Sequence, residues 1–80
     1  MSNLDIQKRV VGMFEEILEV EPGSVKAEQT FEELEIDSVL FIRVVVQCET
    51  EFDIQFEDEM LFAAKFPDVK SYISYIETKV

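Results

Sequence analysis

Turn-forming residues are scarce in this sequence, which has two glycines and two prolines among 80 residues. An all-β domain of this length would need a turn signal about every 10 residues, so the scarcity favours a few long helices. Hydrophobic residues make up 48% of the chain, which is enough for a packed interior. A chain this short can build one core, so we expect a single domain over residues 1–80.

Two segments have the apolar periodicity of an amphipathic helix. The first is expected over residues 3–20, with Asn3 as its N-cap and Pro22-Gly23 ending it. Its apolar face consists of Ile6, Val10, Met13, Phe14, Ile17 and Leu18. The last helix is expected from its cap, Asp68, to about Lys79. Its apolar face consists of Val69, Tyr72, Ile73, Ile76 and Val80.

Residues 21–37 lack a regular period and predict a long loop, and loops this long are often functional in small domains. Its isolated apolar residues are expected to anchor it to the core: Val25, Phe31, Leu34 and Ile36. Thr30 and Glu33 form the T-x-x-E pattern of a capping box, which predicts a single helical turn.

The segment 38–52 is rich in β-branched residues, so propensity alone favours a strand. Spacing favours a helix instead, with Asp37 at the N-cap position. The residues that recur at i, i+4, i+7 and i+11 are Phe41, Val45, Cys48 and Phe52. Residues 53–56 are then expected to form a connector, and residues 57–65 a short helix with Met60, Leu61 and Ala64 on its apolar side.

The second helix has more apolar residues than one buried face can hold. Val39, Ile42 and Val46 form a further stripe at i, i+3 and i+7. Either another helix covers this stripe, or the stripe is an exposed patch that binds partner proteins. The sequence leaves both alternatives open.

The charge balance disfavours some partners and favours others. The chain has 7 basic and 18 acidic residues, a net charge of -11, which repels nucleic acids and anionic membranes and attracts basic protein surfaces. No apolar run exceeds five residues, so no membrane-spanning segment is expected. The only cysteine, Cys48, falls on an apolar helix face, which predicts a core residue and a reducing, cytoplasmic location.

Catalysis by this chain alone is not expected. The sequence has no histidine to act as a general base or metal ligand, one cysteine, and no glycine-rich phosphate loop. Its acidic clusters, residues 32–37 and 57–59, lack the spacing of an EF-hand loop, so we predict no metal site.

Ser38 follows the long loop and begins the second helix, where its hydroxyl should face solvent. One interpretation is a helix-starting residue that hydrogen-bonds backbone N–H groups. The other is an attachment point, because the unpaired N–H groups and positive dipole at a helix N-terminus favour a phosphodiester. No neighbouring base activates Ser38, so as a nucleophile it would need the active site of another enzyme.

The sequence around Ser38 resembles a known family. The run FEELEIDSV, residues 31–39, is similar to the F-x-x-L-G-x-D-S-L signature of acyl and peptidyl carrier proteins. Residues 49–52 are similar to the helix end E-x-x-F of that family, and residues 66–73 to the start of its last helix. The resemblance implies an all-α bundle of acyl-carrier type, with three longer helices and one short one.

The resemblance also implies a function. Ser38 would carry 4'-phosphopantetheine, transferred from coenzyme A by a phosphopantetheinyl transferase. The thiol of this arm would hold a cargo as a thioester, loaded by a ligase, an adenylating enzyme or an acyltransferase and passed to a downstream synthase or transferase. The residues assigned to partner recognition are Asp37, Val39, Ile42, Arg43, Val46 and Glu49.

Three positions depart from the family pattern. Glu35 replaces the usual glycine, Val39 replaces leucine, and Arg43 stands where fatty-acid carriers usually have an acid. We therefore expect a monomeric, free-standing carrier of an acyl or aminoacyl group in a specialised polyketide or nonribosomal pathway. The alternatives are a housekeeping fatty-acid carrier and, from another class, a non-covalent acidic helical interaction module.

Overall fold

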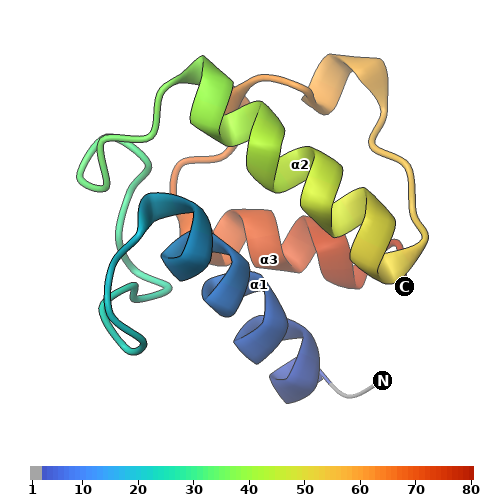
Figure 1. The fold of residues 1–80 in the computed structure, drawn as a ribbon. Helices are drawn as coiled ribbons and strands as arrows, with labels where there is room; N and C mark the ends of the chain where they lie inside the picture. The colour runs from blue at the N-terminus through green and yellow to red at the C-terminus, as the bar shows by residue number, and fades with distance from the viewer. Residues whose placement is uncertain (1–2) are drawn as a thin grey trace.

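A computed structural model describes residues 3–80 of the chain, which form helices and no strand (Figure 1). Three α-helices are present in this part: α1 (Asn3–Leu18), α2 (Ser38–Phe52) and α3 (Val69–Glu77). Two 3₁₀-helical turns lie between α2 and α3: η1 (Asp58–Met60) and η2 (Ala63–Lys65). The expected all-α fold is confirmed, and the spacing of Phe41, Val45 and Cys48 correctly predicted a helix where propensity favoured a strand.

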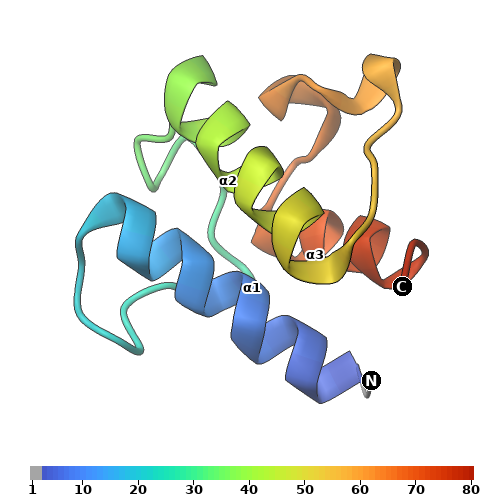
Figure 2. The same ribbon diagram turned by 45° about the vertical axis from the view of Figure 1, so that its right-hand side comes forward.

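The helices pack around one interior. Helix α1 contacts both α2 and α3, and Figures 1 and 2 show α3 lying beneath α2. The loop from residue 19 to residue 37 closes one side of this arrangement, and residues 53–68 return along another side (Figures 1 and 2). The start of α2 lies at the outer edge of the bundle, away from the α1–α3 contact.

Tyr72 of α3 lies at the centre of an aromatic cluster. Its ring centroid is 5.3–6.0 Å from five phenylalanine rings, those of Phe14, Phe31, Phe41, Phe56 and Phe66. Pairs at this spacing add stabilisation beyond the burial of apolar area. These phenylalanines come from α1, α2 and both loops, so the cluster joins every part of the fold.

The buried hydroxyl of Tyr72 is also satisfied. It donates a hydrogen bond to Cys48 Sγ at 3.3 Å, and the thiol in turn donates to Met13 Sδ at 3.4 Å. Cys48 is fully buried, which confirms its expected place in the core. These two hydrogen bonds link the three helices through buried polar atoms.

The long loop is anchored as expected. Val25, Phe31 and Ile36 are buried and Leu34 is half-buried. The Thr30 hydroxyl accepts from the Glu33 N–H, and the Glu33 carboxylate accepts from the Thr30 N–H, both at 2.9 Å. This is the reciprocal pattern of a capping box, so the expected helical turn forms.

Glu15 makes a further contact to this loop that the sequence analysis missed. It is a buried carboxylate on α1, and it accepts hydrogen bonds from the N–H groups of Gly23 at 2.7 Å and Val25 at 3.2 Å. Helix α1 ends at Leu18, two residues before the expected Val20, because Glu19 adopts a left-handed conformation with φ of 58°. The chain then turns back toward Glu15.

The predicted continuous helix over residues 57–65 is wrong. The segment forms η1 and η2, separated by Leu61 and by Phe62, whose backbone is extended. Met60 and Leu61 are only half-buried and Ala64 is exposed, so little apolar burial supports a regular helix here. Glu57 also provides no side-chain cap at the start of η1.

Burial should protect the Cys48 thiol from reagents in solution. Desolvation raises the pKa of this thiol to about 11, so it is neutral at ordinary pH as well as inaccessible. We expect an aromatic disulfide reagent to react with the native protein on the order of a thousandfold or more slower than with the unfolded chain, because reaction requires unfolding. A Ser74→Cys, Cys48→Ala variant is the control, since Ser74 is exposed on α3 and its replacement should react at once. Fast reaction of Cys48 would contradict the packing.

Candidate functional site

Ser38 is the first residue of α2, and Asp37 is the N-cap before it. Asp37 Oδ1 accepts a hydrogen bond from the Leu40 N–H at 2.8 Å, and the Asp37 carbonyl accepts from the Phe41 N–H at 2.9 Å. The capping role that Ser38 could have had therefore belongs to Asp37. Ser38 is exposed, and its hydroxyl makes no hydrogen bond to any residue from 3 to 80.

The position of Ser38 is fixed by the core. Phe41 follows it by three residues, is buried, and packs with Phe31, Phe66 and Tyr72. The start of α2 is thus held on an aromatic cluster while the Ser38 hydroxyl points outward. Such a serine is accessible to another enzyme but cannot shift easily relative to the fold.

The turn before Ser38 depends on Glu35, which adopts a left-handed conformation with φ of 57°. The Glu35 N–H donates to the Glu32 carbonyl at 3.0 Å, and the Ile36 N–H donates to the Phe31 carbonyl at 2.9 Å. These two bonds form a Schellman motif, in which glycine is the usual left-handed residue. Glu35 therefore occupies a position that favours glycine, and the turn forms with glutamate.

The apolar stripe of α2 is exposed. Val39 is 67% exposed, Ile42 41% and Val46 54%, and no other helix between residues 3 and 80 covers them. Of the two alternatives left open by the sequence, the structure supports the exposed patch. Phe62, between η1 and η2, is a further exposed aromatic residue, at 62%, that the periodicity did not reveal.

Of the three charged residues assigned to recognition, Arg43 and Glu49 differ in their surroundings. Arg43 is exposed and makes no ion pair within the described chain. Glu49 is half-buried, and its carboxylate accepts a hydrogen bond from the Phe56 N–H at 2.8 Å. The Glu49 carbonyl also accepts from the N–H groups of Asp53 and Ile54. Glu49 thus holds the connector after α2 through both its side chain and its backbone carbonyl.

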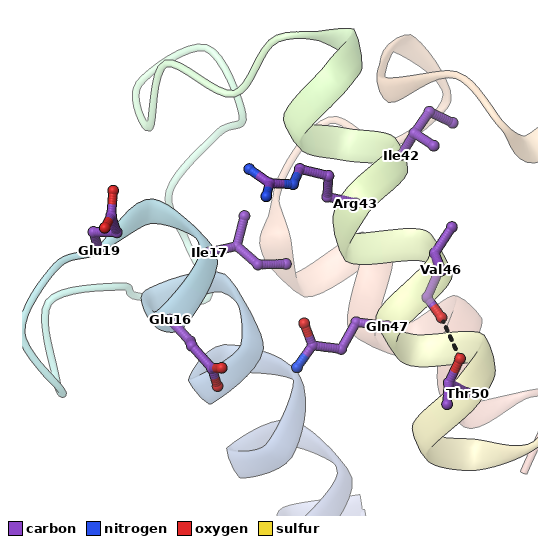
Figure 3. Close-up of a pocket in the computed structure, with 8 residues that line it drawn as sticks. All are labelled: Glu16, Ile17, Glu19, Ile42, Arg43, Val46, Gln47 and Thr50. Atoms are coloured by element: carbon purple, nitrogen blue, oxygen red, sulfur yellow. Dashed lines mark hydrogen bonds between the residues drawn. The ribbon is translucent and has the colours of Figure 1, made fainter.

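Two hollows lie along α2, and one of them adjoins Ser38. The first, of about 370 Å³, is lined by Ser38, Val39, Ile42 and Arg43. The second, of about 750 Å³, lies between α1 and α2 and shares Ile42 and Arg43 with the first (Figure 3). Both are open to solvent, so they suit a flexible group attached nearby better than an enclosed substrate.

Residues 3–80 hold no cluster of metal ligands and no membrane-spanning helix. No group of three or more histidine, cysteine, aspartate or glutamate side chains there is arranged to hold a metal ion. No helix in the same range has the length and apolar character needed to cross a membrane.

Comparison with known proteins identifies the family. The family described as "Phosphopantetheine attachment site" matches residues 8–76. The chain belongs to this family of phosphopantetheine-binding carrier proteins. An acyl carrier protein of Bdellovibrio bacteriovorus is 37% identical over 75 residues, covering 92% of this chain and 94% of its own length. Covalent 4'-phosphopantetheine is accordingly the cofactor of this carrier.

Other relatives agree. The meromycolate extension acyl carrier protein of Mycolicibacterium aurum is 31% identical over 78 residues, covering 95% of this chain and 80% of the relative. The crystal structure of an acyl carrier protein from Thermotoga maritima superposes with a TM-score of 0.79 at 30% identity, covering 99% of this chain and 91% of that one. The fold of this carrier is therefore that of acyl carrier proteins.

The left-handed conformation at Glu35 predicts the effect of restoring the family's glycine. A Glu35→Gly substitution should raise the free energy of unfolding by about 0.5–1 kcal/mol, because glycine adopts this conformation without a Cβ clash. Equilibrium denaturation would measure the change. Glu35→Ala is the control, since it removes the same charge but keeps the Cβ. Equal stabilisation by both variants would assign the effect to charge and contradict the backbone explanation.

Proposed function

We propose that Ser38 is the residue to which 4'-phosphopantetheine is attached. The observation that carries the proposal is the free, exposed hydroxyl of Ser38, at a helix start where Asp37 provides the cap. In a family of phosphopantetheine carriers, this serine has the accessibility that modification by another enzyme requires.

The surroundings of Ser38 suit a phosphodiester. The N–H groups of Ser38 and Val39 make no hydrogen bond to other residues in the range 3–80, as expected at the first turn of a helix. These groups and the positive end of the α2 dipole favour a negative charge beside the Ser38 oxygen. The adjacent hollow leaves room for the rest of the arm.

We further propose that the chain is a single carrier domain that acts as a monomer and catalyses no reaction itself. When bound, the arm supplies a terminal thiol that holds an acyl or aminoacyl group as a thioester. A phosphopantetheinyl transferase adds the arm. The cargo is then loaded by a ligase, an adenylating enzyme or an acyltransferase, and a downstream synthase or transferase takes it. Asp37, Val39, Ile42, Arg43, Val46 and Glu49 are proposed to contact these enzymes.

The pathway we favour is a specialised one. Arg43 supports this choice, because it gives the exposed face of α2 a positive charge where fatty-acid carriers usually have an acid. The strong net charge of -11 favours the alternative, a housekeeping carrier of fatty-acid synthesis, since it resembles free-standing acyl carriers. A partner assay distinguishes the two: a specialised carrier should be a poor substrate for a fatty-acid malonyl transferase.

The attachment site can be tested by intact-mass measurement after incubation with coenzyme A and a broad-specificity phosphopantetheinyl transferase. We expect the mass to increase by one phosphopantetheine group. Ser38→Ala should show no increase, and Ser74→Ala, which removes an exposed serine from α3, should behave like the parent protein.

Circular dichroism of Ser38→Ala provides the folding control, because Asp37 still caps α2 in that variant. A mass increase in Ser38→Ala would overturn the site assignment. No increase in the parent protein, with a transferase that modifies another carrier in parallel, would instead favour a non-covalent interaction module.

A further inference from the structure

The hollow between α1 and α2 is an open groove with a distinct arrangement of side chains. Figure 3 shows Arg43 and Gln47 extending from α2 toward α1, and Ile17 extending from α1 toward α2. Glu16 and Glu19 lie on the α1 side. The groove is therefore lined by apolar side chains of both helices, by a basic and an amide group from α2, and by acidic groups from the α1 side.

This groove adjoins the smaller hollow beside Ser38. Its lining shares Ile42 and Arg43 with the smaller hollow beside Ser38. Along α2 the groove extends to Thr50, which is about 18 Å from Ser38 at the rise of an α-helix. A group attached to Ser38 could thus run along the groove without crossing any packed segment.

Two polar groups of the α2 wall lack partners within residues 3–80. Arg43 makes no ion pair there, and the Gln47 carboxamide makes no hydrogen bond. Thr50, in contrast, already donates its hydroxyl hydrogen to the Val46 carbonyl at 3.0 Å. The wall therefore offers a cation nearest the attachment point, followed by an amide one helical turn farther along.

The functional groups of a phosphopantetheine arm follow each other in an order that matches these side chains. Its phosphodiester is adjacent to the serine, a geminal dimethyl group follows, and two amides precede the terminal thiol. A guanidinium pairs well with a phosphate, and a carboxamide can both donate to and accept from an amide. Ile17 and Val46 provide apolar contact for the dimethyl group.

The core is a less suitable place for the arm. Rings of Phe31, Phe41 and Phe66 lie 5.8–6.5 Å apart around Tyr72, directly behind the start of α2. Close-packed rings of this kind must be displaced before a polar chain can enter, which is costly. The surface groove requires no such rearrangement.

We propose that the arm on Ser38 lies in the α1–α2 groove, with its phosphodiester at Arg43 and its first amide at Gln47. This inference rests on the proposed attachment at Ser38. Because Glu16 and Glu19 line the opposite wall, a neutral or cationic cargo can remain in the groove, whereas a cargo with its own carboxylate is repelled.

The test uses the full chain labelled with carbon-13 and nitrogen-15 and loaded from unlabelled coenzyme A, after intact mass has verified loading. Isotope-filtered nuclear Overhauser spectra then report contacts between arm and protein. We expect contacts from the geminal methyl groups of the arm to Ile17 and Val46 methyl groups, and a shift of the Gln47 side-chain amide signals. Arg43→Ala, driven to complete loading with excess transferase as checked by intact mass, should lose these contacts.

Arg9→Ala is the matched control, because Arg9 is the other arginine of the chain and does not line the groove. It should retain the contacts of the parent protein. A loaded protein whose arm contacts only the neighbours of Ser38, or contacts Phe41 and Phe66, would overturn the inference and leave the proposed function intact. Unchanged contacts in Arg43→Ala would overturn the role of the guanidinium. Failure to load at all would overturn the proposed function instead.

Discussion

The packing of Phe41 against Tyr72 links the core of this protein to the start of α2, where Ser38 lies. Tyr72 lies on α3 and Phe41 on α2, with ring centroids 6.0 Å apart, and both rings are almost fully buried. Because Ser38 precedes Phe41 by less than one helical turn, anchoring the ring also fixes the direction in which the serine hydroxyl points. The same cluster includes Phe31, so it also fixes the loop that leads into α2.

Adjacent residues divide two tasks at the start of α2. Asp37 satisfies the helix terminus by accepting from the Leu40 N–H, and the Ser38 hydroxyl has no hydrogen-bond partner among residues 3–80. If serine itself were the cap, modification would break a hydrogen bond that stabilises the helix, at a cost of about 1 kcal/mol. With aspartate as the cap, a group can be added to the serine while the fold is unaffected. This arrangement suits a protein that must stay folded while its cargo changes.

Most of the fold could be predicted from the sequence because its strongest signals are local or periodic. The spacing of Phe41, Val45 and Cys48 was sufficient to predict α2, and the T-x-x-E pattern correctly predicted the Thr30–Glu33 turn.

Two features could not be predicted from local or periodic signals. Glu15 reads as one more surface acid on α1, and only the three-dimensional path of the loop brings the N–H groups of Gly23 and Val25 to its carboxylate. The prediction of a continuous helix over residues 57–65 failed for a related reason. The apolar residues of this segment gain too little burial to stabilise a regular helix.

In the candidate site, too, local sequence signals predicted some features, and tertiary structure determined others. Asp37 and Ser38 could be placed from the motif, and the exposure of Val39 was one of two stated alternatives. The groove between α1 and α2 was not predicted. It depends on tertiary packing, which brings Ile17 of α1 and Gln47 of α2 to the same hollow although they are far apart in sequence. The role of Glu49 in holding Phe56 was also hidden, since it requires the chain to reverse direction after α2.

The central claim is that Ser38 carries the arm in the cell. The most direct measurement is peptide mapping by tandem mass spectrometry of the protein isolated from its own cells, with no transferase added. We predict that the peptide containing Ser38 carries a phosphopantetheine group, and that peptides containing Ser24, Ser71 or Ser74 do not. Ser38 found unmodified in protein from cells that produce the pathway's product, or an arm found on another serine, would contradict it.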